Sequence, residues 1–455
     1  MVTVIVISTE ELGDRSYIAH DGTVAIVVDP QRDIDRVEEA LGQANLRLEA
    51  VLETHVHNDY VSGGLELARR TGARYVLAAG DRLAFAHEEV RDGDRLAAGA
   101  MTIEVVATPG HTDSHVAYVI GDESGANAVF SGGSLLYGSV GRTDLVDSER
   151  VDELTRAQYR SVRRLCGLVA NDTQLYPTHG FGSFCSSGDA VGGLGSTVGI
   201  EKGRNDALIA TDEDSFVESL VTRLGAYPSY YAHMAPLNRS GPGPVDYSPV
   251  ALVDQSELAA RLRRGEWVVD LRERRAFAAS HLSGSLSFEL AASFTTYLGW
   301  LIPWGSPLTL LAPTASQVEA AQRQLSRIGI DEIAGAALGP TGDLATDVAE
   351  RSYRVTTFAE LASAGEVNIL DVRRDDERAS AFIPGSFHLP LQQLRACLEK
   401  VPAGEVFVHC ASGYRASIAA SILDAAGRQV VLVDDDFANA QGVVCAGAAH
   451  STTAA

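Results

Sequence analysis

The run Thr54-His55-Val56-His57-Asn58-Asp59-Tyr60 carries the clearest chemical signal in this chain of 455 residues. It follows a largely apolar run, Leu46 to Leu52, that is typical of a buried strand. The two histidines are spaced two residues apart, so in an extended turn their side chains point the same way. Asp59 follows two residues later. Imidazole and carboxylate groups gathered in one turn are candidate metal ligands.

Two more histidines follow strand-like runs further along the chain. His111 lies in Ala107-Thr108-Pro109-Gly110-His111-Thr112, and His179 lies in Tyr176-Pro177-Thr178-His179-Gly180. Functional side chains commonly stand on loops at the ends of strands. With the first motif, these residues give four histidines and one carboxylate just past predicted strands.

The composition predicts a globular protein of two or three domains. Hydrophobic residues make up 45% and charged residues 21% of the chain. The net charge of -23 argues against nucleic acid and anionic membranes as partners. No apolar run reaches the roughly 18 residues of a membrane span, and the five scattered cysteines disfavour a disulfide framework. We expect a cytoplasmic protein, and a homo-oligomer stays open.

Residues 1–235 alternate short strand-like runs with polar turns and helical stretches, which predicts an α/β domain. The predicted strands include Val24–Val28 and Ile103–Ala107, and one predicted helix covers Glu149–Leu168. A stretch rich in Gly and Pro, from Tyr227 to Pro244, then predicts a linker.

An internal repeat fills the second half of the chain. Val268-Val269-Asp270-Leu271-Arg272 recurs as Ile369-Leu370-Asp371-Val372-Arg373, and His281-Leu282-Ser283-Gly284-Ser285 recurs as Phe382-Ile383-Pro384-Gly385-Ser386. Both pairs are offset by 101 residues (371 minus 270, and 385 minus 284). The shared offset predicts two homologous α/β domains, at 247–345 and 352–445.

The second repeat carries a candidate nucleophile, Cys410. The strand-like run Val406–His409 is followed by Cys410-Ala411-Ser412-Gly413-Tyr414-Arg415 and then by a helical run. The N–H groups of such a loop and of the helix N-terminus attract an anion, which favours a thiolate at Cys410. Arg415 offers a guanidinium fork to an anionic donor, and we expect Ser412 and Gly413 to contact that donor.

The first repeat has no cysteine at the equivalent place. It reads Leu308-Thr309-Leu310-Leu311-Ala312-Pro313-Thr314-Ala315 there. Domain 247–345 therefore cannot carry sulfur on a cysteine, and we expect a structural role for it. Packing the other domains and shaping a substrate channel both stay open.

Together these motifs resemble those of known families. The Cys410–Arg415 loop, with Leu370-Asp371-Val372-Arg373 and Ile383-Pro384-Gly385-Ser386, resembles rhodanese sulfurtransferases, which implies that Cys410 carries a persulfide. The first domain resembles the metallo-β-lactamase superfamily, with its H-x-H-x-D-H signature. The resemblance implies a metallo-β-lactamase αββα sandwich followed by two rhodanese-like α/β domains, the first of which lacks the active cysteine.

The order of the three domains resembles bacterial persulfide dioxygenase–rhodanese fusions. Val140-Gly141-Arg142-Thr143-Asp144, His179 to Cys185, and Asn238 to Pro242 are similar to motifs of that family. Its members bind one non-haem iron through two His and one Asp and oxidise a low-molecular-weight persulfide with O2. The resemblance implies one Fe(II) per chain, with Zn as an alternative. It also implies a small thiol, persulfide or carrier-bound sulfur as partner, and Arg142 as a candidate for binding an anionic group of the substrate.

Two positions depart from the family pattern. The iron-binding Asp belongs in Phe130-Ser131-Gly132-Gly133-Ser134-Leu135, where Gly133 takes its place, and Tyr60 stands where the first motif ends in His. A two-metal hydrolase needs both missing groups. Tyr60 either orients substrate or fills the space of a second metal.

Three arrangements of the first site stay open. In the first, His55, His57 and His111 hold one metal as a three-histidine set. In the second, His55 and His111 bind iron beside a vacant position at Gly133. In the third, the site holds no metal and serves as a scaffold. Asp59 and His179 are further candidate ligands.

We expect an enzyme of sulfur metabolism that oxidises a persulfide-type substrate at one metal and transfers sulfane sulfur through Cys410. One alternative is a sulfurtransferase with an inert first domain. Another is a tailoring enzyme of a specialised pathway that acts on a thiocarboxylate or thioester sulfur. The altered ligands motivate the last hypothesis, because a changed site suggests a changed substrate.

Overall fold

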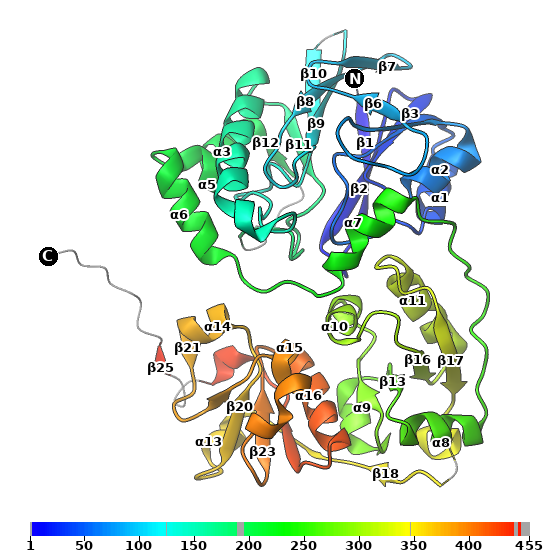
Figure 1. The fold of residues 1–455 in the computed structure, drawn as a ribbon, viewed down its shortest axis with the longest axis vertical. Helices are drawn as coiled ribbons and strands as arrows, with labels where there is room; N and C mark the ends of the chain where they lie inside the picture. Colours follow the sequence, from blue (N-terminus) through cyan, green and yellow to red (C-terminus); the bar gives the residue numbers. More distant parts are fainter. Residues whose placement is uncertain (1, 124, 189–194, 346, 441–444, 447–455) are drawn as a thin grey trace, which may run out of the picture. The chain divides into compact units, whose positions relative to one another are not determined.

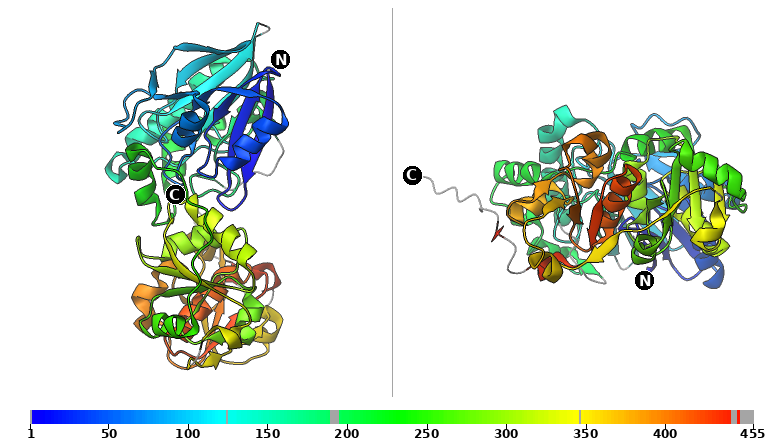
Figure 2. Two further views of the ribbon diagram at one scale, coloured as in Figure 1. Left: turned by 90° about the vertical axis from the view of Figure 1, so that its right-hand side faces the viewer. Right: turned by 90° about the horizontal axis from the view of Figure 1, so that it is seen from below.

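The computed structural model describes residues 2–123, 125–188, 195–345, 347–440 and 445–446. The chain divides into two compact units: residues 1–246 with 324–329 form unit 1, and residues 247–323 with 330–455 form unit 2. Figure 1 and Figure 2 trace the elements of each unit along the chain.

The first sheet of unit 1 has six strands in the order of the sequence. They are β1 (Thr3–Thr9), β2 (Asp14–His20), β3 (Val24–Val28), β4 (Arg47–Leu52), β5 (Arg74–Ala78) and β6 (Glu88–Val90). The first three strands pair antiparallel, and β3 to β6 pair in parallel. Because parallel strands need a crossover, α1 (Asp35–Gln43) connects β3 to β4 and α2 (Gly64–Thr71) connects β4 to β5.

The second sheet of unit 1 has the strand order β12-β11-β10-β9-β8-β7. The strands are β7 (Arg95–Ala98), β8 (Met101–Ala107), β9 (Val116–Asp122), β10 (Gly125–Gly132), β11 (Gln174–Pro177) and β12 (Ser196–Thr197). The helices that follow β10 in the sequence are η1 (Ser148–Arg150), α3 (Val151–Leu168), α4 (Val198–Lys202), α5 (Asp206–Ile209), α6 (Glu213–Arg223) and α7 (Tyr231–Ser240). β10 and β11 are parallel, and η1 and α3 connect them.

The core of unit 1 lies between its two sheets. Tyr17 and Ile26 of the first sheet share one buried apolar cluster with Ile103, Tyr118 and Phe130 of the second. The outer face of the first sheet packs against α1 and α2, and the outer face of the second packs against α3 and α6. Figure 1 shows these helices on the outside of the sheets. The four layers confirm the predicted αββα sandwich.

The candidate histidine ligands and Gly133 all follow the carboxyl ends of strands. His55 and His57 follow β4, His111 follows β8, Gly133 follows β10 and His179 follows β11. The predicted strand Val24–Val28 has the bounds of β3, and Ile103–Ala107 lies within β8. The predicted helix Glu149–Leu168 begins within η1 and continues as α3.

Unit 1 also includes residues 324–329, which come from the second half of the chain. Arg327 is 5% exposed, and its guanidinium donates to Asp33 at 2.8 Å and to Glu11 at 3.2 Å. Its carbonyl oxygen accepts the Val61 N–H at 2.7 Å, one residue after Tyr60. This segment therefore anchors the end of the histidine-containing turn.

Unit 2 contains two parallel sheets. The first has the order β15-β13-β16-β17 and the second the order β19-β24-β23-β20-β22. The strands of the first are β13 (Trp267–Asp270), β15 (Leu286–Ser287), β16 (Leu308–Ala312) and β17 (Ile333–Leu338). Those of the second are β19 (Arg354–Thr356), β20 (Asn368–Asp371), β22 (Phe387–His388), β23 (Val406–His409) and β24 (Val430–Val433). Short pairs join β14 (His281–Leu282) to β18 (Glu350–Arg351) and β21 (Ala381–Phe382) to β25 (Cys445–Ala446).

The helices of unit 2 follow a similar order in both repeats. Those of the first are α8 (Gln255–Arg263), α9 (Arg274–Ala279), α10 (Phe294–Leu301), α11 (Ala315–Ser326) and α12 (Thr341–Leu344). Those of the second are α13 (Phe358–Ala362), α14 (Asp375–Ser380), α15 (Leu391–Leu394), η2 (Arg395–Lys400), α16 (Tyr414–Ala425) and η3 (Phe437–Asn439). The order β15-β13-β16-β17 corresponds to β22-β20-β23-β24. The starts of β13 and β20 differ by 101 residues (368 minus 267), and so do those of β15 and β22 (387 minus 286).

The two repeats lie in one compact unit, so the boundaries 1–235, 247–345 and 352–445 stay a prediction. Residues 441–444 of the last range lie outside the described residues. Within the described ranges, no helix combines the length and the apolar character needed to cross a membrane.

The buried ion pair of Asp33 with Arg327 gives a stability prediction. Burial alone would raise the pKa of Asp33, but Arg327 and Arg36 lower it below its usual value. The pair therefore stabilises the fold above about pH 4 and stops doing so as the pH falls through the folded pKa. We expect Arg327→Met to lower the free energy of unfolding by about 1.5–3 kcal/mol at pH 7, the worth of a hydrogen bond to a charged group.

Urea unfolding at pH 7 and at about pH 3 measures this effect, and Arg47→Met, which removes a surface charge on β4, is the matched control. The difference between Arg327→Met and wild type should shrink at the lower pH. A difference that does not change with pH would contradict the assignment to Asp33.

Candidate metal centre and cysteine loop

The histidine turn after β4 is held by a buried carboxylate. Asp29, at the end of β3, accepts the Thr54 N–H at 2.7 Å and the Thr54 hydroxyl at 2.7 Å. Asp29 is fully buried and has a left-handed φ of 52°. The Thr54 hydroxyl in turn lies 2.9 Å from Nδ1 of His55. Because Thr54 donates to Asp29, its oxygen accepts from Nδ1–H of His55, which orients the imidazole.

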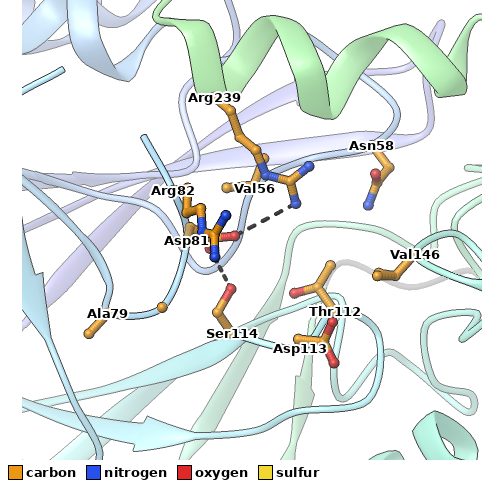
Figure 3. A pocket seen from close by; sticks show the side chains of 11 residues that line it. Val56, Asn58, Ala79, Asp81, Arg82, Thr112, Asp113, Ser114, Val146 and Arg239 are labelled. Carbon is orange, nitrogen blue, oxygen red and sulfur yellow. Dashed lines mark hydrogen bonds and ion pairs between the residues drawn. The ribbon is translucent and has the colours of Figure 1, made fainter. Parts of the chain in front are cut away.

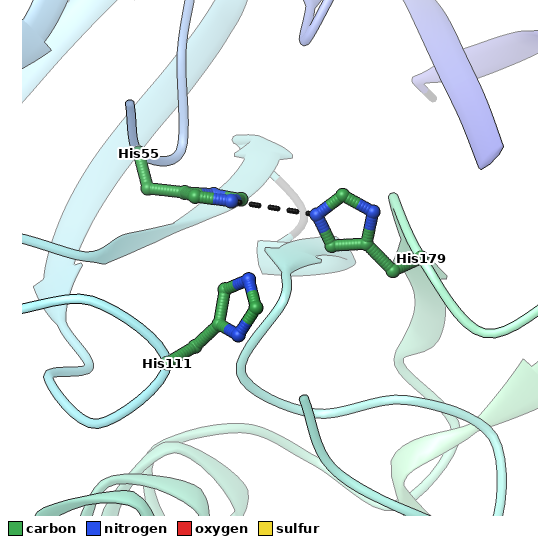
Figure 4. Close-up of side chains that lie close together, drawn as sticks. All are labelled: His55, His111 and His179. Atoms are coloured by element: carbon green, nitrogen blue, oxygen red, sulfur yellow. Dashed lines mark hydrogen bonds between the residues drawn. The ribbon is translucent and has the colours of Figure 1, made fainter. Parts of the chain in front are cut away.

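Three imidazoles converge at the strand ends: His55, His111 and His179 (Figure 4). One ligand atom from each lies within 4.8 Å of the others. Nε2 of His55 is 3.4 Å from Nε2 of His179. Nε2 of His111 is buried and has no hydrogen-bond partner. The unpaired Nε2 of His111 is costly in a buried site, and the three converging imidazoles fit a shared metal ion.

The opposite nitrogen of each imidazole is engaged by the protein. Nδ1 of His111 lies 2.7 Å from the Arg142 carbonyl oxygen, and Nδ1 of His179 lies 2.8 Å from Asp14. With the Thr54 contact of His55, every ring has a partner that fixes its orientation. Metal-binding histidines are usually held in this way, with the free nitrogen directed at the ion. The donor set thus fits one metal ion.

Burial sets the protonation of two of these rings. It lowers the pKa of His111 to about 3 and the pKa of His55 well below its usual value. Both imidazoles are therefore neutral near pH 7, the form that binds metals. His179 differs: burial opposes its charge, but the carboxylates of Asp59 and Asp14 raise its pKa well above the usual value, so a metal bound by this ring would displace a proton.

His57 occupies a different environment from the other three histidines. Its Nε2 lies 3.2 Å from Glu53 and 3.3 Å from Asp29, and its Nδ1 is buried without a partner. Burial opposes its charge, but Asp29 and Glu53 raise the pKa of His57 to about 9. His57 groups with Asp29 and Glu53, or with Asp59 and His179, rather than with His55 and His111. Its role as a ligand stays a prediction.

Tyr60 fills space beside His57. Its ring stacks on His57 with centroids 4.2 Å apart, and its hydroxyl lies 3.0 Å from Nε2 of His57. The side chain is fully buried, and its hydroxyl donates to the Asp29 carbonyl at 3.3 Å, so a role in orienting a substrate stays a prediction. Of the two roles expected from the sequence, this position fits the filling of a second metal's space.

Gly133 lies against the ring of His111. A Cβ atom at this position would lie 2.2 Å from Cδ2 and 2.6 Å from Nε2 of His111. The imidazole therefore occupies the space that an aspartate side chain would need. The Gly133 N–H donates to Nε2 of His115 at 3.0 Å, which holds the backbone in place.

Arg142 supports the loops around the site. Its Nε and Nη2 donate to Asp144 at 2.7 Å, Nη2 also donates to the Gly225 carbonyl at 2.7 Å, and Nη1 donates to the Phe184 carbonyl at 3.1 Å. The residue is 3% exposed. These contacts use most of its N–H donors, and its role in binding a substrate anion stays a prediction.

Asp14, Asp29, Glu53 and His115 contact the histidines of the candidate site or the turn that carries them, and they did not enter the sequence prediction. His115 stacks on His55 with ring centroids 4.8 Å apart. The sequence alone could have indicated Asp29, because it directly follows the five apolar residues of β3. Nothing local in the sequence indicates Asp14, since its contact with His179 spans 165 positions.

The predicted nucleophile lies on a strand–loop–helix unit of unit 2. β23 ends at His409, Cys410 is 1% exposed, and the 12-residue helix α16 begins at Tyr414 after Gly413 with a φ of 88°. Arg415 pairs with Glu377 through N–O distances of 2.5 and 2.7 Å. The guanidinium group of Arg415 is thus paired with a carboxylate of α14 beside the Cys410 loop. Ser412 is exposed and Gly413 is buried.

Asp434 packs against the Cys410 loop at Gly413. A Cβ atom at Gly413 would lie 2.0 Å from Oδ1 of Asp434, so glycine permits the close approach. Asp434 accepts from Arg274 at 2.6 Å and from Arg275, both in the region of the first repeat. The Tyr414 hydroxyl donates to the Glu289 carbonyl at 2.9 Å. Residues of the cysteine-free repeat therefore fix the loop of Cys410.

Two family models match separate parts of the chain. Residues 15–192 match the metallo-beta-lactamase superfamily, and residues 355–441 match the rhodanese-like domain. The chain therefore has a metallo-β-lactamase-fold domain followed by a rhodanese-like domain.

The similar curated proteins carry two activities in their names. A hydroxyacylglutathione hydrolase of Methylobacillus flagellatus is 36% identical over 166 residues, which are 36% of this chain and 60% of that protein. The mitochondrial persulfide dioxygenase ETHE1 of Homo sapiens is 31% identical over 180 residues, which are 39% of this chain and 65% of that protein. The first three relatives are matched over 60%, 60% and 64% of their lengths.

A solved structure supports the fold. The metallo-beta-lactamase of Staphylococcus aureus subsp. aureus COL has a TM-score of 0.67 at 24% identity, over 74% of this chain and 99% of that one. At this identity the likeness concerns the fold alone.

The close contact of Gly133 with His111 gives a second prediction. Gly133→Ala places a methyl group against the ring and must displace it, because His111 is held by the Arg142 carbonyl. We expect the affinity for Fe(II) or Zn(II) to fall by roughly tenfold or more, as when a supporting contact of a ligand is lost. Metal content after anaerobic loading measures this. Gly167→Ala on α3, where a Cβ meets nothing within 4 Å, is the control.

Gly133→Asp tests the same point in the other direction. We expect the introduced carboxylate to disturb His111 rather than to create a second metal position. Binding of two metal ions per chain by Gly133→Asp would contradict the steric argument.

Proposed function

We propose that this protein is an enzyme of sulfur metabolism that oxidises a persulfide-type substrate at one metal in unit 1. We propose further that it transfers sulfane sulfur through Cys410 in unit 2. The observation that carries the first part is the buried, unpaired Nε2 of His111 facing the imidazoles of His55 and His179. Similarity to a persulfide dioxygenase and the rhodanese-like domain support the choice of sulfur chemistry.

His55, His111 and His179 would hold the metal, with Asp59 next to them. A bound Fe(II) would supply redox chemistry and leave coordination positions open for sulfur and O2, as in non-haem oxygenases. The protein's contribution is to orient the three rings through Thr54, Arg142 and Asp14. All three imidazoles are at most 2% exposed, so bulk water is kept from the centre.

A two-metal hydrolase is not supported by this site. Hydrolysis is the activity named for several relatives, but two positions that would serve a second metal are changed. Gly133 offers no side chain, and the Tyr60 hydroxyl is bound to His57. We therefore place the chemistry at one metal.

Cys410 is suited to receive sulfur. The free N–H groups in the first turn of α16 and the loop favour negative charge at the sulfur. In the transfer, the Cys410 thiolate attacks the outer sulfur of a persulfide R–S–S⁻. The S–S bond breaks, R–S⁻ leaves, and Cys410 carries the new persulfide anion until an acceptor thiolate or cyanide removes the outer sulfur.

We propose that the first repeat is a second rhodanese-like domain with a supporting role. It has the strand order of the second repeat and no cysteine at the end of β16. Arg274 and Arg275 bind Asp434, which lies against Gly413. In this proposal the repeat keeps its fold to hold the Cys410 loop.

A sulfurtransferase with an inert unit 1 is the second candidate. The observation in its favour is the loss of the carboxylate at Gly133. Two variants distinguish the candidates. We expect Cys410→Ser to reduce thiocyanate formation from thiosulfate and cyanide by roughly 100-fold or more and to leave O2 uptake on glutathione persulfide unchanged. His111→Ala should abolish O2 uptake and bound iron and leave thiocyanate formation unchanged.

Cys397→Ser is the control for the loss of a thiol, because Cys397 is a free cysteine outside the loop. Full sulfur transfer by Cys410→Ser would contradict the role of Cys410. If wild type binds no metal after incubation with Fe(II) and consumes no O2, the sulfurtransferase with an inert unit 1 replaces the persulfide-oxidising enzyme as the favoured function.

The ion pairs of Arg274 with Asp434 and Glu289 give a further prediction. Arg274→Met removes two charged hydrogen bonds, to Asp434 and Glu289. A bond of this kind is worth about 1.5–3 kcal/mol, so we expect sulfur transfer to slow by roughly tenfold or more. The loss should appear in kcat with little change in KM, and Arg274→Lys should restore part of it. Arg264→Met, a surface variant on the same repeat, is the control. Equal kcat values for Arg274→Met and Arg264→Met would contradict the claim that Arg274 positions the Cys410 loop.

A further inference from the structure

The histidine turn of unit 1, residues 53–62, ends at two backbone N–H groups that are bound by residues far away in the sequence. The Ser62 N–H donates to the side-chain oxygen of Asn238 in α7 at 2.8 Å. The Val61 N–H donates to the carbonyl oxygen of Arg327 at 2.7 Å. These two hydrogen bonds fix the end of the turn, and one of them comes from the second half of the chain.

Part of this turn borders a cavity. Val56 and Asn58 line a pocket of about 480 Å³, and Figure 3 shows both side chains at it. Along this part the turn faces the pocket and not a packed wall of side chains. Hydrogen bonds at the two ends of the turn, of which the bond to Arg327 is one, therefore hold its backbone.

Arg327 is itself held in place within unit 1. It lies between β16 and β17 in the sequence, and the segment 324–329 belongs to unit 1. Its Nη2 and Nε donate to Asp33 at 2.8 and 3.2 Å, and its Nη1 donates to Glu11 at 3.2 Å. Asp33 is 1% exposed. Charge-assisted bonds to a buried carboxylate restrict the guanidinium strongly, and they thereby fix the residue that carries the carbonyl.

The residues next to Arg327 hold the same segment. Leu325 and Ile328 are fully buried. The Ser326 carbonyl accepts from Nη1 of Arg32 at 3.4 Å. The segment is thus a packed part of the protein, and the carbonyl that it offers to the histidine turn has a defined position.

The end of the turn is linked to its histidines by direct contacts. Tyr60 directly precedes Val61, and its ring stacks on His57 with centroids 4.2 Å apart. The ring centroids of His57 and His55 are 4.1 Å apart. Because closely packed interiors transmit displacements, a shift of Val61 moves Tyr60 and both imidazoles.

We infer that Arg327 is a positioning residue for the metal centre, and that the cysteine-free repeat completes the histidine turn through it. The metal in this statement rests on the proposed function, whereas the position of the turn does not. The acceptor of the Val61 N–H lies outside residues 1–246, so that part of the chain alone does not hold the turn in this arrangement. The first repeat thus contributes to both centres: Arg274 acts at the Cys410 loop and Arg327 at the histidine turn.

The first test measures amide hydrogen exchange of peptides that cover residues 53–62 in the metal-free, full-length protein. We expect exchange there to be at least about tenfold faster in Arg327→Met than in wild type, the change for one lost hydrogen bond to a charged group. Arg272→Met is the matched control, because Arg272 of the same repeat donates to the buried Asp270 at 2.6 Å. It should leave the exchange of the turn unchanged, and Arg327→Lys should restore part of the protection.

The second test measures Co(II) binding, because the visible spectrum of Co(II) reports the number and geometry of its ligands. We expect Arg327→Met to weaken Co(II) binding by roughly tenfold or more and to change the spectrum, as when a contact that orients a ligand is lost. Arg272→Met should match wild type in both. A merely structural role of Arg327 would lower stability in both variants and leave the spectrum of the bound Co(II) unchanged.

Equal exchange of residues 53–62 in Arg327→Met and Arg272→Met would overturn the inference. An unchanged Co(II) affinity and spectrum in Arg327→Met would also overturn it. If Arg327→Met does not fold, Glu11→Gln takes its place, and unchanged exchange in that variant overturns the inference. A wild type that binds no Co(II), with faster exchange in Arg327→Met alone, supports the positioning of the turn and removes the proposed oxidation.

Discussion

The buried carboxylate of Asp29 is the interaction on which the centre of unit 1 depends. It accepts hydrogen bonds from Thr54 and Thr178 and lies 3.3 Å from Nε2 of His57, so it joins the ends of β3, β4 and β11. Burial alone would raise its pKa, but His57 and these hydrogen bonds lower it. Because a buried anion must be paired, the positions of the surrounding turns are fixed together.

The changes at Gly133 and Tyr60 are coupled to this frame. His111 lies where an aspartate side chain would be, and Tyr60 stacks on His57, which is itself drawn to Asp29 and Glu53. Side chains therefore fill the space around Gly133 and Tyr60. Close packing of this kind holds His55, His111 and His179 together, and His57 and Asp59 form a further candidate group with His179.

The two repeats of unit 2 differ chemically at the same place in the strand order. Both repeats keep the same strand order, and only one has a cysteine at the end of the third strand of that order. The other repeat supplies Arg274 and the carbonyl of Glu289 to the elements around that cysteine. The repeat without a cysteine thus contacts the loop that carries Cys410.

The sequence by itself determined the layered fold of unit 1, the repeat and the Cys410 loop. Each of these follows from a pattern that can be seen in the sequence: strand periodicity, an offset of 101 residues, and a strand–loop–helix run. Only the tertiary structure decided which groups meet. His179 contacts His55, which lies 124 positions away in the sequence. Arg142 donates a hydrogen bond to the carbonyl of Gly225, which lies 83 positions away. The direction of a side chain at a strand end depends on the packing of distant loops, and no local pattern in the sequence records that packing.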